Sequence, residues 1–431
     1  MNTPIGRPVY LIDGLRTPQL KARGEPGPFH AADLAVAAGR ALLQRQSFPP
    51  TALDEVILGC VAAGPDEANI ARVVALRLGC GHAVPAWTVQ RNCASGLQAL
   101  DAAAADIALG RADLVLAGGA EAMSHHPVLW NDAMVVWLAR FNRARNLPSR
   151  LAALAHLRTA HFKPVIGLLR GLTDPVVGLS MGQTAEELAT RFAIPRAAMD
   201  SYAVESHRRL AAAQADLAAH EIAPLFDGKT LLDRDDGLRV DSNLAGLGKL
   251  KPVFDPKYGR VTAGNSAQVS DGAACLLLAS ADAVEKFGLT PRARLTEVVW
   301  AGLDPAQMGL GPAYAIGRLL LRHGWDTQDI DAWEINEAFA AQVLACLLAL
   351  ADADFCRAEL GCNGPFSPIS PQRLNPDGGG IALGHPVGAS GARIVLHLLR
   401  SLEASGGRRG IASLCIGGGQ GGAVLIEREV T

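Results

Sequence analysis

The chain has 431 residues, 49% of them hydrophobic, so it is long enough for two or three domains with large buried cores. A formal net charge of −2 argues against a nucleic-acid partner, and any anionic substrate must meet a local basic site. The first ten residues lack the apolar core of a signal peptide, and no stretch is apolar for the length of a membrane span, so we expect a cytoplasmic protein.

Two similar series of elements follow one another along the chain. The first begins with a predicted strand over residues 8–15 and continues with a strand over residues 53–59. A helix rich in Ala and Leu then begins at residues 93–96 and ends at Gly110, and an apolar strand over residues 113–119 follows. Strands that alternate with helices predict parallel sheets covered by helices.

Residues 125–254 do not fit either series and are predicted to form a helix-rich loop domain inserted in the first half of the protein. Within it, residues 133–173 contain seven Lys or Arg residues and no Asp or Glu, interleaved with aromatic residues and Leu. Such a basic amphipathic stretch is typical of a solvated face on a domain that packs or oligomerises. It is also typical of a surface that meets an anionic membrane or an acidic partner subunit.

The second series repeats the order of the first. Its strands and its helix start are predicted at residues 294–303, 330–336, 410–419 and 388–391. The two helix starts correspond, because Cys-Ala-Ser-Gly in the first series matches Gly-Ala-Ser-Gly in the second. We therefore predict an α/β protein with two similar halves, formed by residues 1–124 with 255–285 and by residues 286–431.

The eight cysteines are expected to be free thiols, because disulfides are rare in a reducing compartment. The pairs Cys60/Cys80 and Cys356/Cys362 can be argued either way. Neither pair has the close spacing of a tetrahedral zinc site, so we expect no metal.

Cys93 is a candidate nucleophile. It stands at a predicted helix start, where unpaired backbone N–H groups and the helix dipole favour an anion and lower the pKa of a thiol. A buried packing role is the alternative for a cysteine in such a place.

His385 lies in a glycine-dense loop over residues 378–388, which leads into the helix start of the second series. Gly384 and Pro386 on either side leave it little freedom to move. A lone histidine of this kind is usually structural, but paired across the repeat with Cys93 it becomes a candidate base for the thiol.

Two further candidates stand where a strand ends. Cys415 precedes three glycines, and it is either a buried residue beside a tight turn or a second reactive thiol, with the N–H of Gly417 free to face a cleft. Asn336 is either the N-cap of the following helix or part of a site. Ligand sites in α/β proteins lie at the carboxyl ends of strands, so these candidates can converge.

Four short motifs resemble the signature blocks of the thiolase family and follow one another in the family's order. They are Asn92 to Gly96, Asn336 to Ala340, Gly384 to Pro386, and Cys415 to Gly421. The resemblance covers nearly the whole chain. It implies the duplicated thiolase fold with five layers in the order αβαβα, and an acyl-CoA C-acyltransferase that catalyses reversible Claisen condensation or thiolysis of 3-ketoacyl-CoA.

The resemblance also implies a role for each reactive residue. Cys93 attacks the thioester and holds the acyl group, and His385 is the base that takes its proton. Cys415 exchanges a proton with the α-carbon of the second acyl-CoA. One oxyanion hole is formed by His385 with a water held by Asn336, and the other by the N–H groups of Cys93 and Gly417.

The substrates implied are coenzyme A and acyl-CoA, with no further cofactor. By resemblance, Arg239 contacts the CoA nucleotide, Ser180 and Met181 line the acyl or pantetheine tunnel, and Ser266 lies near the pantetheine. The family often has a serine two residues after the equivalent of Asn265, whereas this chain has Ala267 there. A homodimer or homotetramer is the expected assembly.

Other departures bear on the subtype. The Cys93 motif reads Cys-Ala-Ser-Gly, the inserted domain is long, and an extra segment spans residues 355–374. These features are closer to thiolases of the β-oxidation type, including the β subunit of trifunctional complexes, than to the short biosynthetic type. The alternatives are a ketosynthase-like condensing enzyme, against which Cys415 and its glycines argue, and a catalytically silent protein that binds acyl-CoA or lipid.

Overall fold

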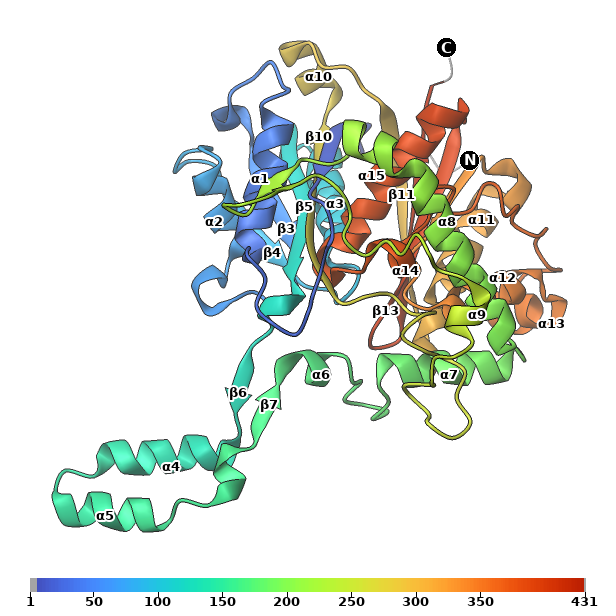
Figure 1. Cartoon of the computed structure of the whole chain (residues 1–431). Helices are drawn as coiled ribbons and strands as arrows, with labels where there is room; N and C mark the ends of the chain where they lie inside the picture. Colours follow the sequence, from blue (N-terminus) through green and yellow to red (C-terminus); the bar gives the residue numbers. More distant parts are fainter. Residues whose placement is uncertain (1–5, 430–431) are drawn as a thin grey trace.

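A computed structural model describes residues 6–429 (Figure 1). The first half supplies one part of a large mixed sheet and the helices that cover it. Its helices and strands are β1 (Tyr10–Arg16), β2 (Leu20–Lys21), α1 (Ala31–Leu43), β3 (Glu55–Gly59), α2 (Ile70–Arg77), β4 (Ala86–Val89), α3 (Ser95–Ala108), β5 (Leu114–Ala122), β10 (Ser270–Ala279) and α10 (Ala281–Phe287).

The second half repeats the succession of strands and helices. Its elements are β11 (Ala293–Gly302), α11 (Gly311–His323), β12 (Ala332–Ile335), α12 (Ala340–Ala351), α13 (Ala353–Phe355), α14 (Gly380–Leu383), α15 (Val387–Ser405), β13 (Arg409–Ile416) and β14 (Gln420–Glu427). Thus β1, α1, β3, α3, β5 and β10 correspond to β11, α11, β12, α15, β13 and β14, as the repeat in the sequence predicts.

The strands follow the order β12-β13-β14-β11-β1-β10-β5-β3-β4, with β2 paired to β10. The halves meet where β1 pairs with β11, Tyr10 opposite Arg294 and Leu11 opposite Ala293. The prediction of parallel sheets is wrong in part, because among the strand pairs of residues 6–429 only β3–β4, β3–β5 and β12–β13 are parallel. A tight turn joins β13 to β14, and a connection that short permits only antiparallel pairing.

Helices separate and cover the two parts of the sheet. The central helices α3 and α15 pack against each other and against strands of both halves, while α1 covers β10 and β5 and α11 covers β14 and β11 on the outer faces. This gives layers of helix, sheet, helix, sheet and helix. The central helices approach closely because Gly96 and Gly391 carry no side chain: a Cβ on Gly391 would lie 2.4 Å from the Leu97 nitrogen. Since both glycines stand in the first turns, the two helix starts are brought together.

The inserted domain lies between β5 and β10. Its elements are β6 (Val128–Trp130), α4 (Asp132–Arg143), α5 (Leu147–Ala155), β7 (Pro164–Ile166), α6 (Gly167–Gly171), α7 (Met181–Arg191), α8 (Arg196–His220), β8 (Leu225–Phe226), β9 (Leu231–Leu232) and α9 (Leu244–Leu247). Helices α7 and α8 pack on the second half through α12. No helix within residues 6–429 is both long and apolar enough to cross a membrane.

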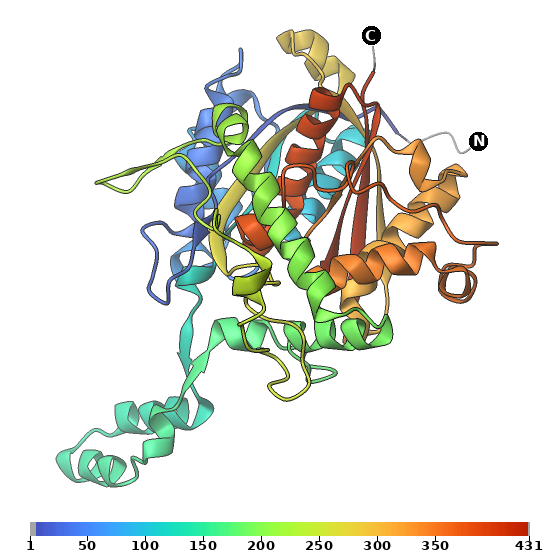
Figure 2. The same ribbon diagram turned by 45° about the vertical axis from the view of Figure 1, so that its right-hand side comes forward.

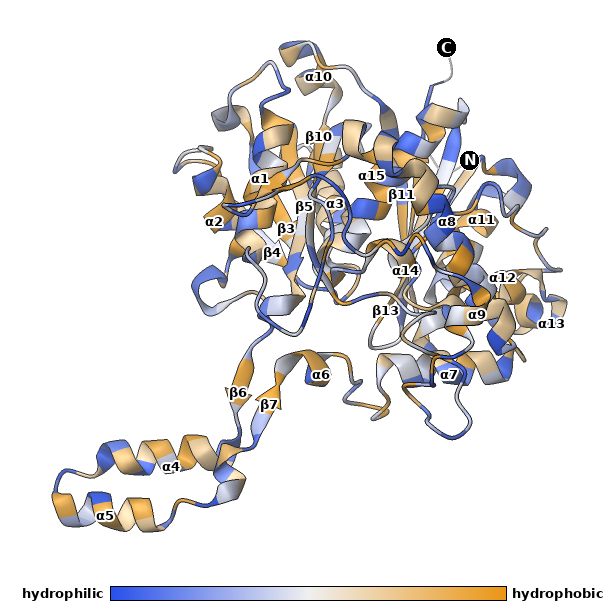
Figure 3. Ribbon diagram, in the orientation of Figure 1, coloured by the Kyte–Doolittle hydropathy of each residue, from blue (hydrophilic) through white to orange (hydrophobic). Residues whose placement is uncertain are grey.

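Residues 128–166 form an arm that projects from the body of the molecule (Figures 1 and 2). Strands β6 and β7 pair at its base, and α4 and α5 lie side by side at its end, where the Trp137 Nε1–H donates to the Ala153 carbonyl at 2.8 Å. Hydrophobic and hydrophilic residues alternate along both helices (Figure 3). Only Met134 in α4 and Ala153 in α5 are buried, so most of the arm's apolar side chains face outward.

Candidate active site

Cys93 lies in the tight loop between β4 and α3. The sequence predicted Cys93 in the first turn of a helix. In the structure α3 begins at Ser95, so Cys93 lies two residues before the helix. Asn92 has a positive φ of 44°, and its Nδ2 donates to the Gly417 carbonyl at 2.8 Å. This hydrogen bond ties the loop of Cys93 to the turn after Cys415.

The expectation of a lowered thiol pKa at Cys93 is wrong in its net direction. Burial raises the pKa of Cys93, although the backbone N–H groups of Gly417 and of Cys93 itself lower it in part. The N–H groups are therefore placed to stabilise negative charge at the sulfur, but the thiol needs a base to become a thiolate.

His385 is buried at the end of the glycine-dense loop, directly before α15. Its Nδ1 lies 2.6 Å from the Ser390 Oγ, and the Ser390 hydroxyl donates to the Pro386 carbonyl at 3.0 Å. We assign the imidazole hydrogen to Nδ1 and the lone pair to Nε2, because the Ser390 hydroxyl hydrogen is placed on the Pro386 carbonyl. Burial, with the nearby Arg393, lowers the pKa of His385 to about 4, so the ring is a neutral base at neutral pH.

Asn336 lies directly after β12 and faces the same histidine. Its Nδ2 is 3.4 Å from His385 Nε2. The N-cap alternative for Asn336 is wrong, because α12 begins only at Ala340 and Phe339 occupies the N-cap position. Within the described residues the buried Asn336 Oδ1 has no hydrogen-bond partner, which leaves an acceptor that can hold a water or a ligand group.

Cys415 stands near the end of β13, in a small apolar cluster with Met308 and Ala338, against which Met181 packs. Burial and the proximity of Cys93 both raise the pKa of the Cys415 thiol, so the two sulfurs share one site. The turn that follows needs glycine: Gly418 has φ +90°, and Gly419 has φ +77° and lies against the Leu303 carbonyl.

A cavity of about 410 Å³ opens beside Cys93. Its lining includes Asn92, Cys93, Met181, Val387, Gly417 and Gly418. Residues from both halves and from the inserted domain thus meet at one place. The structure brings Cys93, Cys415 and Gly417 together in one cluster and His385 with Asn336 in another, at the two helix starts that α3 and α15 hold in contact.

The residues expected to contact CoA do not all lie at the cavity. Met181 lines the cavity, whereas the Ser180 side chain caps α7 by accepting the Gln183 N–H. Ser266 is buried and donates to the Thr262 carbonyl at 2.7 Å. Arg239 lies away from the cavity, where its backbone N–H donates to His207 Nδ1.

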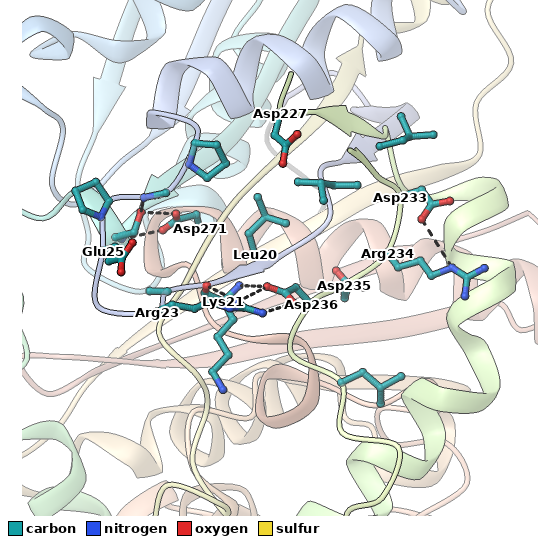
Figure 4. A pocket seen from close by; sticks show the side chains of 18 of the residues that line it. Leu20, Lys21, Arg23, Glu25, Asp227, Asp233, Arg234, Asp235, Asp236 and Asp271 are labelled. Carbon is teal, nitrogen blue, oxygen red and sulfur yellow. Dashed lines mark hydrogen bonds and ion pairs between the residues drawn. The ribbon is translucent and has the colours of Figure 1, made fainter. Parts of the chain in front are cut away.

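A second hollow of about 700 Å³ lies along residues 20–28 and 227–240 (Figure 4). None of the reactive residues lines it. Most of its charges are paired, for example Arg23 with Asp236 at 2.7 Å. Lys21 extends away from that pair (Figure 4), and burial together with the neighbouring Arg239 and Arg23 lowers the pKa of Lys21. Arg239 does not line the hollow but is close enough to act on Lys21.

Two buried carboxylates support the site, and neither was expected from the sequence. Glu337 accepts from Tyr202, Ser206 and Asn375, which ties α8 and the segment before the glycine loop to the end of β12. Glu121 accepts the N–H groups of Val61, Ala62 and Gly388. The sequence signal was present at Glu337, in the Asn336 motif, but its role depends on partners distant in sequence.

An ion network lies behind the His385 loop, along α15. His397 Nδ1 is 2.9 Å from Glu221, which pairs with Arg16, and Arg393 is 3.3 Å from Glu334. These carboxylates raise the pKa of His397 to about 9, against the opposing effect of burial. The helix that follows the candidate base is thereby anchored to the inserted domain and to β1.

Family models match almost the whole chain. The model of the thiolase N-terminal domain matches residues 9–282, and that of the thiolase C-terminal domain matches residues 289–428. The chain belongs to the thiolase family. The duplicated thiolase fold predicted from the sequence is confirmed, and the protein is an acyltransferase of this family.

Similar thiolases have different names. The beta-ketoadipyl-CoA thiolase of Pseudomonas aeruginosa is 41% identical over 98% of this chain and 100% of its own length. The mitochondrial trifunctional enzyme subunit beta of Bos taurus is 35% identical over 98% of this chain and 88% of its length. The structure of human mitochondrial 3-ketoacyl-CoA thiolase in complex with CoA has a TM-score of 0.83 and 36% identity, with 98% of both chains covered.

Proposed function

We propose that this thiolase transfers acyl groups between carbon and coenzyme A, by reversible thiolysis of 3-ketoacyl-CoA through an acyl-enzyme on Cys93. The observation that carries the proposal is that Cys93, which shares one site with Cys415, and the neutral His385 stand directly before α3 and α15, two helices that pack against each other. Cys93 and Cys415 are close enough for one to raise the pKa of the other, and His385 keeps the Nε2 lone pair free.

In the first step of the proposal, His385 Nε2 takes the proton of Cys93 and the thiolate attacks the 3-keto carbon. The N–H groups of Cys93 and Gly417, which already act on the sulfur, are the donors for one oxyanion. When the bond between C2 and C3 breaks, Cys415 gives its proton to C2. Its raised pKa supports this role, since a protonated thiol is needed for it.

Asn336 and His385 supply the proposed second oxyanion site. The unpartnered Asn336 Oδ1 supports the placement of a water there, and His385 can donate once it has taken a proton. Finally the CoA thiol gives its proton to the Cys415 thiolate and its sulfur takes the acyl group from Cys93, while His385 returns its proton to the Cys93 thiolate. No redox change occurs in this sequence.

We propose that CoA reaches the site past Met181 and Ser266, with its phosphates at Lys21 and Arg239. Neither of these two side chains has an ion pair within residues 6–429, and Arg239 is close enough to lower the pKa of Lys21. An anion between two unpaired cations relieves their repulsion. The Ser180 hydroxyl, which caps α7, acts indirectly by placing Met181 at the cavity.

The finer assignments are also proposals. Relatives named as 3-ketoacyl-CoA thiolase and as a trifunctional-enzyme subunit support a degradative, β-oxidation-type role, while those named as beta-ketoadipyl-CoA thiolase support a shorter substrate. Eight free thiols support a reducing, cytoplasmic location. We propose a homo-oligomer by analogy with the family.

We also propose that the arm docks on an anionic lipid surface. It carries most of the seven cations of residues 133–173 without an acidic residue in that stretch, and its exposed apolar side chains include Leu138, Leu147 and Leu151. A second copy of the same arm would bring like charges together. Co-sedimentation with anionic vesicles that weakens at high salt is expected; salt-insensitive sedimentation would leave self-association as the better account.

The catalytic proposal is tested by thiolysis assays of the purified protein with CoA and 3-ketoacyl-CoA of several chain lengths. Acetyl-CoA and an acyl-CoA two carbons shorter are the expected products. No product at any chain length, from protein shown to be folded, would contradict the proposal.

A further inference from the structure

The cavity beside Cys93 is lined by one positively charged side chain that has no role in the reaction proposed above. Arg170, in the short helix α6, lines this cavity together with Cys93 and Met181. Its backbone carbonyl accepts the Thr173 N–H at 3.2 Å. Its guanidinium has no hydrogen bond or ion pair to any residue between 6 and 429, and the side chain is exposed. The guanidinium is therefore free to bind an anion that enters the cavity.

The other charged residues of the lining do not neutralise it. Asp174 is only 2% exposed; its Oδ1 accepts the N–H groups of Val176 and Val177 at 2.8 and 3.1 Å, and its Oδ2 is buried. The Oδ2 has no hydrogen-bond partner within residues 6–429, and no ion pair joins this carboxylate to Arg170 there. His126 also lines the cavity, and its Nε2 lies 3.7 Å from the Glu121 carboxylate. Among the charged residues of the lining, Arg170 is the one that is exposed.

The rest of the wall is mainly apolar. Val61, Met123, Leu168, Leu172 and Val176 contribute to it. Apolar walls around one free guanidinium fit a short acyl chain that ends in a carboxylate, because Arg binds carboxylates through two parallel hydrogen bonds.

The cavity does not reach the residues proposed above for the CoA phosphates. Of the residues proposed above for CoA, only Met181 lines it, and Lys21, Arg239 and Ser266 do not. Arg170 comes from α6 at the base of the arm, whereas Lys21 lines the second hollow.

We propose that Arg170 binds the terminal carboxylate of a dicarboxylic 3-ketoacyl chain while the keto carbon is held at Cys93. This inference rests on the proposed function and deepens it. With 3-oxoadipyl-CoA, Cys93 Sγ bonds to C3, the bond between C2 and C3 breaks, and its electron pair takes a proton to give acetyl-CoA. The succinyl group stays on Cys93 until the CoA thiolate takes it as succinyl-CoA.

The test compares 3-oxoadipyl-CoA with 3-oxohexanoyl-CoA, which has the same six-carbon chain with a methyl group in place of the carboxylate. We expect the wild type to prefer the dicarboxylic substrate in kcat/KM. Arg170→Gln is expected to lower kcat/KM for that substrate by about 10- to 100-fold and to leave the neutral substrate and the KM for CoA unchanged. Arg170→Lys should retain part of the preference.

Arg45→Gln is the matched control, because Arg45 is an exposed cation without an ion pair among residues 6–429 and outside the cavity lining. Thermal melting of each variant separates misfolding from a loss of recognition. Equal losses with both substrates, or no preference in the wild type, would overturn the inference, and so would a raised KM for CoA, which would place Arg170 at the phosphates. Activity with neither substrate would instead refute the proposed function itself.

Discussion

The starts of α3 and α15 have the same sequence pattern, but the candidate nucleophile precedes the first helix and the candidate base precedes the second. In the first half, the Ser95 Oγ donates to the Asn92 carbonyl at 2.7 Å and accepts the Arg91 N–H at 2.9 Å. In the second half, the equivalent Ser390 donates to the Pro386 carbonyl and its oxygen faces the His385 ring at 2.6 Å. One serine therefore shapes the backbone under the nucleophile, and the other orients the base.

The comparison shows how duplication can divide a reaction between two copies of one element. Ser95 is the first residue of α3 and Ser390 is the fourth residue of α15, and the close contact at Gly96 and Gly391 brings the two helix starts together. What differs is the residue placed on each loop. The thiol of Cys93 requires a base, because burial raises its pKa, and the second copy supplies a histidine that burial keeps neutral.

The largest expected effect separates Cys93 from the second thiol. Cys415→Ala should still form the acyl-enzyme but lose carbon–carbon bond formation and thiolysis by about 10²- to 10⁴-fold, because only the step at the α-carbon needs that proton. Exchange of solvent deuterium into the methyl group of acetyl-CoA measures this step. Exchange at the wild-type rate would assign the α-carbon proton to another group.

The two serines allow a matched pair of substitutions. Ser390→Ala should lower kcat by about tenfold, because His385 loses the acceptor that fixes its tautomer, with little change in the KM for CoA. The pH profile of kcat should change with it. Ser95→Ala should mainly lower thermal stability, by about 1 kcal/mol, because its partners are backbone groups.

If the two variants behaved alike in both kcat and stability, the two helix starts would not have the different roles assigned to them. The kinetic split and the melting temperature are therefore measured on both proteins under the same conditions.

The smallest effect concerns the ion network that only α15 carries. The pKa of His397 is raised from 6.5 to about 9, so its ion pairs stabilise the fold below pH 6.5 and lose that contribution as the pH rises through 9. Between pH 7 and 9 the free energy of unfolding should fall by about 2 to 3 kcal/mol through this group. Glu334, with a pKa raised to about 7, changes mainly below this window.

Denaturant titrations at pH 7 and pH 9 measure how far the free energy of unfolding falls between these pH values. The His397→Gln variant should lose most of this fall, although the variant is less stable than the wild type at pH 7. A wild-type slope that the variant keeps would show that His397 is not the group responsible.

The sequence predicted much of the site, since its motifs are local. Cys93, His385, Asn336 and Cys415 each stand at a strand end or a helix start, and the repeat indicated that these places converge. The antiparallel strands were missed because helix and strand alternation does not distinguish a hairpin at residues 417–419 from a crossover.

Effects that depend on distant partners could not be predicted. Burial reversed the expected direction of the Cys93 pKa, and the buried Glu121 and Glu337 work through backbone and side-chain groups from other elements. Arg170 was counted among the cations of residues 133–173, and only the structure places it at the cavity of Cys93 instead of on the arm.

The central claim is that the first helix start holds the nucleophile, and the mass of the intact protein after mixing with acetyl-CoA tests it most directly. We predict one acetyl adduct on the wild type, mapped to the peptide that contains Cys93, and none on Cys93→Ser, because a buried serine hydroxyl is a much weaker nucleophile than a thiolate. An adduct of the same yield on Cys93→Ser, or one mapped to Cys415 in the wild type, would contradict the account.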